Sequence, residues 1–71
     1  MTKKAIFTAI KEANSIADEM SRFSVDSKEY RSLNETLGWW LDSIVDGTRH
    51  WTNRPRIHYS RRTGHYWVTF P

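Results

Sequence analysis

Residues 56–70 read RIHYSRRTGHYWVTF, and this stretch decides the fold that we expect. Two runs rich in β-branched and aromatic residues, 56–60 and 65–70, flank the four-residue loop 61–64, which is typical of a β-hairpin. Gly64 in that loop can adopt a positive φ at no steric cost. The spacing predicts that Ser60 pairs with His65 across the hairpin.

This pairing would give the hairpin two chemically different faces, because side chains alternate along a strand. One face is apolar and aromatic, with Ile57, Tyr59, Tyr66, Val68 and Phe70. The other face is more polar and consists of Arg56, His58, Ser60, His65, Trp67 and Thr69. An isolated hairpin is barely stable in water, so we expect the apolar face to pack on the rest of the chain.

Two amphipathic helices are predicted before the hairpin. Over residues 3–22 the apolar side chains recur at helical spacing, as Ile6, Ala9, Ile10, Ala13, Ile16, Ala17 and Met20. A second such stripe, over residues 27–46, consists of Tyr30, Leu33, Leu37, Leu41 and Ile44. Thr2 is the candidate N-cap of the first helix, and Asp26 with Glu29 has the spacing of a capping box for the second. Gly38 lies inside the second helix, so a break into two shorter helices is the competing interpretation.

These patterns together predict a single α+β domain over residues 1–71. Two antiparallel helices are followed by a connector over residues 47–55, in which Pro55 forbids helix, and by the hairpin (ααββ). The 71 residues include no cysteine, so neither a disulfide nor a thiolate metal site can hold the domain together. The core has to come from aliphatic and aromatic side chains.

Charge is divided unevenly along the chain. No acidic residue follows Asp46, and the five arginines of residues 47–71 give that segment a charge of +5, whereas residues 1–46 carry −2. Five aromatic residues are interleaved with these arginines: Trp51, Tyr59, Tyr66, Trp67 and Phe70. Guanidinium groups pair with phosphates and aromatic rings stack on bases, so this composition favours a nucleic-acid partner.

We therefore expect a small, non-enzymatic protein that binds RNA or DNA through its basic, aromatic hairpin. The expected nucleic-acid-binding residues are Arg54, Arg56, His58, Arg61, Arg62, His65 and Trp67. The competing interpretation is that the arginines keep a small aromatic sheet in solution and form ion pairs with the acids of the helices.

Trp39 suggests an alternative function. It lies on the polar face of the second helix, among Glu35, Asp42 and Asp46. Either the connector around Trp51 covers it, which is the plainer explanation, or it anchors a partner protein or a second copy of the chain. The alternative is thus a protein–protein effector or inhibitor, of the accessory type found in phages and plasmids, that binds through Trp39 and the acidic face or through the basic hairpin.

A third hypothesis is a metal-free ribonuclease. His58 and His65 would act as general base and acid, and Arg61 or Arg62 would stabilise the phosphorane. We do not favour it, and expect no catalytic residue and no cofactor. The three histidines, with His50, match no zinc spacing, so no metal is expected either. Apolar runs are too short for a membrane span or a signal peptide, which predicts a cytoplasmic protein, monomeric or homodimeric.

Overall fold

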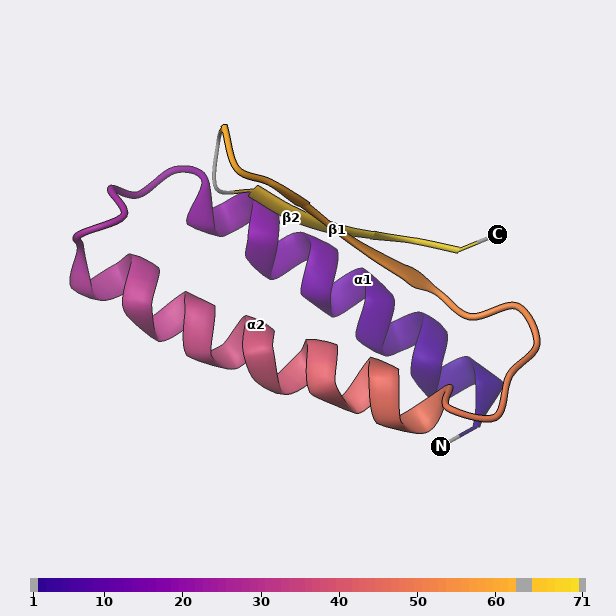
Figure 1. Ribbon diagram of the computed structural model, residues 1–71. Helices are drawn as coiled ribbons and strands as arrows, with labels where there is room; N and C mark the ends of the chain where they lie inside the picture. The colour runs from indigo at the N-terminus through magenta and orange to yellow at the C-terminus, as the bar shows by residue number, and fades with distance from the viewer. Residues whose placement is uncertain (1, 63–64, 71) are drawn as a thin grey trace.

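A computed structural model describes residues 2–62 and 65–70. The chain forms two antiparallel helices followed by an antiparallel hairpin, which confirms the predicted ααββ order (Figure 1). The bounds are Lys3–Met20 for α1, Lys28–Gly47 for α2, Arg56–Ser60 for β1 and His65–Thr69 for β2. Helix α1 lies between α2 and the hairpin and contacts both (Figure 1).

The helices begin at hydroxyl caps. Thr2 Oγ1 accepts a hydrogen bond from the Ala5 N–H at 3.1 Å, as predicted. Helix α2 is capped by Ser27, whose Oγ accepts from the Tyr30 N–H at 3.1 Å, so the expected capping box at Asp26 is wrong by one residue. The reason lies in the preceding turn, where Ser27 Oγ also donates to the Ser24 carbonyl at 2.7 Å and is thereby held at the helix start.

Helix α2 is continuous through Gly38, so the competing interpretation of two shorter helices is wrong. The C-cap of α2 is Thr48, which is buried and donates to the Ile44 carbonyl through both its N–H (3.1 Å) and its Oγ1 (2.6 Å). These two hydrogen bonds to one carbonyl close the last turn of the helix. Helix α1, in contrast, ends at Met20, two residues earlier than expected.

The core is built around the apolar stripe of α1. Its buried members are Ile6, Ala9, Ile10, Ala13, Ala17 and Met20, which pack with Leu37 and Ile44 of α2 and Val68 of β2. Three of these residues, Ala9, Ala13 and Ala17, are spaced one helical turn apart. Their small side chains allow the neighbouring elements to approach α1 closely.

The hairpin has the predicted register, with Ser60 opposite His65 and Arg56 opposite Thr69. Strand β2 packs against α1, whereas β1 packs mainly against β2. The apolar face is therefore covered on β2 but not on β1, where Ile57 is 37% and Tyr59 is 52% exposed. The expectation that this whole face packs on the helices is right for one strand only. Thr63 and Gly64, with the predicted positive φ, lie outside the described residues.

A side-chain amide of α1 forms two hydrogen bonds with the main chain of β2. Asn14 Nδ2 donates to the Val68 carbonyl at 3.0 Å, and the Val68 N–H donates to Asn14 Oδ1 at 2.7 Å. The amide thus offers one donor and one acceptor, as the backbone of a neighbouring strand would. Sequence reasoning assigned no role to Asn14, because nothing in the helical pattern distinguishes it from a solvated polar residue.

Candidate nucleic-acid interface

Three aromatic rings stack on the outward face of the hairpin. The register places Trp67 opposite His58, and His65 lies two residues earlier on the same strand face. The His58 imidazole is stacked on the Trp67 indole with centroids 5.1 Å apart and planes at 14°. The His65 imidazole is also stacked on it, at 6.1 Å and 19°. We call these three residues the ring array.

The ring array is both oriented and accessible. His58 Nε2 lies 2.8 Å from Thr69 Oγ1, which fixes the plane of that imidazole. Trp67 remains 39% exposed, so part of its ring can be contacted by a ligand. The array therefore presents a pre-oriented aromatic surface, and pre-orientation lowers the entropy cost of binding.

Arginines lie at both ends of this face. Arg56 begins β1, while Arg61 and Arg62 follow β1 at the tip of the hairpin, and all three are exposed. Two ion pairs are found within residues 2–62 and 65–70, both in or beside the helices: Arg22–Asp18 at 3.8 Å and Arg49–Asp46 at 3.0 Å. In the described part of the chain the three hairpin arginines thus form no ion pair, whereas Arg49 of the connector does pair with an acid of α2, as the competing interpretation expects.

Arg54 is not part of this face. Its guanidinium donates to the Val45 carbonyl at 3.3 Å, near the C-terminal end of α2. That end of α2 lies at the opposite end of the molecule from the hairpin tip (Figure 1). Of the seven residues predicted for the site, the hairpin therefore brings together six, namely Arg56, His58, Arg61, Arg62, His65 and Trp67.

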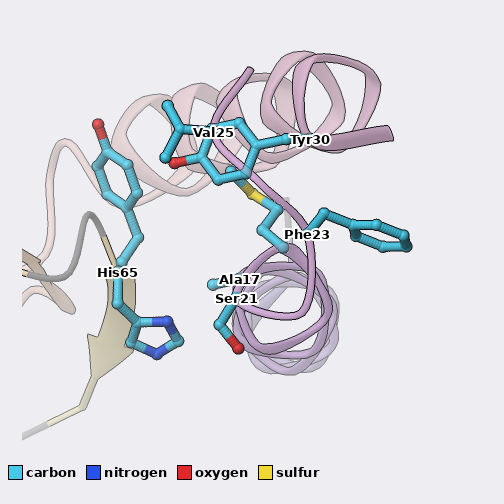
Figure 2. A pocket seen from close by; sticks show the side chains of 8 residues that line it. Ala17, Ser21, Phe23, Val25, Tyr30 and His65 are labelled. Carbon is cyan, nitrogen blue, oxygen red and sulfur yellow. The ribbon is translucent and has the colours of Figure 1, made fainter. Parts of the chain in front are cut away.

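A cavity adjoins the ring array near the hairpin tip. Its volume is about 400 Å³, and it lies between the end of α1, the loop 21–27, the start of α2 and the start of β2. Aromatic side chains make up much of its lining, including Tyr30, Tyr66 and Phe23, while Ser21 and His65 add polar groups. Figure 2 shows His65 beside Ser21, across the cavity from Tyr30. His65 therefore belongs both to the ring array and to this cavity, which sequence reasoning did not anticipate.

Trp39 is not covered by the connector, so the plainer explanation of its position is wrong. It is 61% exposed, and its ring meets the edge of Trp40 with centroids 4.9 Å apart. Trp51 in the connector turns instead toward the hairpin, where it packs against Phe70 at 6.1 Å. Trp51 thus packs against Phe70 and the core and leaves Trp39 exposed. Trp39 lies beside Asp42 in a shallow depression of that face.

Residues 2–62 and 65–70 contain neither a candidate metal site nor a candidate membrane span. No group of three histidine or acidic side chains there could hold a metal ion. No helix in the same residues is long and apolar enough to cross a membrane. Compared with protein families, curated proteins and solved structures, the chain matches none of them.

Proposed function

We propose that this protein binds a strand of RNA or DNA along the outward face of its hairpin. The observation that carries the proposal is the ring array, flanked by Arg56 at one end and by Arg61 and Arg62 at the other. Phosphates would pair with the guanidinium groups, and a base would stack on Trp67. The lack of ion pairs at these arginines within the described residues supports this role, since their charge is available to a ligand.

A single strand fits this face better than a duplex does. Stacking on Trp67 requires a base that is not already stacked between its neighbours, and unpaired strands supply such bases at little cost. The cavity beside His65, at about 400 Å³, lies within the usual size range of ligand pockets and offers a second place for a base. We therefore expect single-stranded RNA or DNA to bind more tightly than a duplex of the same length.

The proposal is tested by measuring binding to labelled single strands and duplexes over a salt series from about 50 to 200 mM. Phosphate contacts with Arg56, Arg61 and Arg62 predict that affinity falls with salt, with a log–log slope of about −2 on a single strand. The double variant Arg61→Ala/Arg62→Ala should reduce the steepness of this slope by about 1.4. A matched control, Lys11→Ala/Arg31→Ala, removes the same charge from exposed helical positions and should leave the slope nearly unchanged.

Two results would count against the proposal. One is the absence of binding to every strand at about 50 mM salt, where electrostatic contacts are strongest. The other is an equal loss of affinity in the hairpin variant and in its charge-matched control, which would show that only net charge matters. The same mixtures test the ribonuclease hypothesis: we expect the RNA to stay intact in the presence of a chelator, whereas cleavage that His58→Ala abolishes would favour it.

A second candidate function rests on the exposure of Trp39. An indole that is 61% exposed beside Asp42 and Asp46 has the composition of an interface anchor. We infer from it a protein–protein effector as the alternative function. A partner that is bound by the native protein and by Trp67→Ala, but not by Trp39→Ala, would favour this alternative. A partner whose binding requires Trp67 would instead place the interface on the hairpin.

A further inference from the structure

We propose that β1 pairs with β1 of a second copy of the chain, which joins two hairpins into one four-stranded antiparallel sheet. The proposal starts from the hydrogen bonds of Val68 and does not depend on nucleic-acid binding. Both main-chain groups of Val68 point at the Asn14 amide, and therefore away from β1.

This contact determines which opposite residues of the hairpin exchange main-chain hydrogen bonds and which do not. In an antiparallel pair, residues that exchange both main-chain bonds alternate with residues whose groups point outward. Val68 is opposite Ile57, so this pair is of the second kind, and Ile57 turns its N–H and C=O away from β2. Tyr59, two residues further along β1, likewise points its N–H and C=O away from β2. Within residues 2–62 and 65–70, no hydrogen bond outside the hairpin is recorded for the main chain of Ile57 or Tyr59.

Apart from the charge of Arg56 at its first position, the outer edge of β1 lacks the features that usually protect an edge strand. Its residues RIHYS include no proline and no lysine, and the register with β2 is unbroken by a bulge. On β1, Ile57 and Tyr59 are also the exposed residues of the hairpin's apolar face; on the other side of the hairpin, Phe70 after the end of β2 is 39% exposed. An open edge and an uncovered apolar patch therefore coincide on the same two residues.

The strand is complementary to itself, which is why we assign a second copy as the occupant. A two-fold axis at His58 places Ile57 opposite Tyr59 of the partner subunit, and both residues point their N–H and C=O groups across the new interface. Four main-chain hydrogen bonds result, and two isoleucine–tyrosine pairs come into side-by-side contact on one face of the sheet. Arg56 comes opposite Ser60 of the partner subunit, so no arginines face each other. Two five-residue strands make a small interface. We therefore expect a weak dimer that forms at high protein concentration and dissociates on dilution.

The experiment measures the mass of the protein by sedimentation and light scattering over a wide concentration range. We expect a rise from the 8.5 kDa monomer toward twice that mass. Amide hydrogen exchange, followed by NMR in dilute and concentrated samples, locates the contact. The amides of Ile57 and Tyr59 should become protected as the dimer forms, whereas the amide of Trp67 should not change.

A proline at position 59 tests the edge directly. Because the Tyr59 N–H points away from β2, Tyr59→Pro removes no bond within the hairpin but two of those between the copies. We expect dimerisation to weaken by about 10- to 100-fold while the monomer stays folded. Should that variant fail to fold, Ile57→Lys places a charge at the same edge and should have the same effect. Trp39→Ala is the control and should leave dimerisation unchanged.

Three results would overturn the proposal. The first is a protein that remains monomeric at millimolar concentration. The second is a dimer in which the amides of Ile57 and Tyr59 exchange as fast as in the monomer. The third is a dimer that Trp39→Ala disrupts and Ile57→Lys does not, which would place the interface on α2.

Discussion

The bond between Asn14 and Val68 gives the sharpest prediction about stability. It joins residues 54 positions apart in the sequence, through contacts of 2.7 and 3.0 Å to a residue that is only 5% exposed. Replacing Asn14 by leucine keeps the branched shape of the side chain but leaves the N–H and C=O of Val68 without partners. An unsatisfied buried group costs about 1–3 kcal/mol, and Val68 would have two. Because both contacts are only partly buried, we expect the free energy of unfolding to fall by about 2–4 kcal/mol, in the lower part of the summed range.

This loss is a large part of the total for so small a domain. At about 0.05–0.15 kcal/mol per residue, a chain of 71 residues has a free energy of unfolding of about 4–10 kcal/mol. Urea and thermal unfolding, followed by circular dichroism, measure the change. A loss of 2–4 kcal/mol corresponds to a fall in Tm of about 10–25 °C.

Two further variants separate hydrogen bonding from packing. Asn14→Ala should destabilise about as much as Asn14→Leu, since both remove the amide. Ser15→Ala, at an exposed neighbouring position of α1, is the control and should change little. A decrease of less than about 0.5 kcal/mol for Asn14→Leu, within the range of ordinary surface substitutions, would refute the conclusion that this amide holds the hairpin on α1.

Three other predictions concern the helices and the core. Gly38→Ala should raise the free energy of unfolding by about 0.5–1 kcal/mol, because a Cβ there meets nothing within 4 Å; a loss of stability in the thermal melt would contradict this. Ser27→Ala should lower the free energy of unfolding by about 1 kcal/mol, whereas Asp26→Ala should leave it nearly unchanged. If urea unfolding showed that Asp26→Ala is the more destabilising of the two, Asp26 would be the N-cap. Leu37→Ala should cost about 2–5 kcal/mol, whereas Val25→Ala at an exposed position should cost little; similar midpoints for the two would place Leu37 outside the core.

The periodic parts of the fold could be predicted from the sequence. Helical stripes identified α1 and α2, and strand alternation with a four-residue loop fixed the register of Ser60 against His65. These patterns are local, so a single sequence is enough to determine them. The same alternation placed His58 and Trp67 on one face, and most of the candidate site follows from it.

What could not be predicted depends on how the elements meet. Alternation gives the apolar face of a hairpin but not which strand lies on the helix, so the exposure of Ile57 and Tyr59 came only from the structure. Trp39 stays exposed because Trp51 packs against Phe70 and not against α2. Which of these two distant surfaces Trp51 contacts does not follow from any local pattern. The role of Asn14 likewise appears only when Val68 is beside it.

The central claim, that the hairpin face binds nucleic acid through stacking on Trp67, is tested most directly by comparing two tryptophan variants. Trp67→Ala and Trp39→Ala each remove one exposed indole, from the hairpin and from α2 respectively. Affinity for a labelled single strand is measured at one fixed salt concentration. Because a base–aromatic stack contributes about 1–3 kcal/mol, Trp67→Ala should bind about 5- to 150-fold more weakly than the native protein, and Trp39→Ala should bind equally well. Equal affinities for native protein and Trp67→Ala, or a loss confined to Trp39→Ala, would contradict the account.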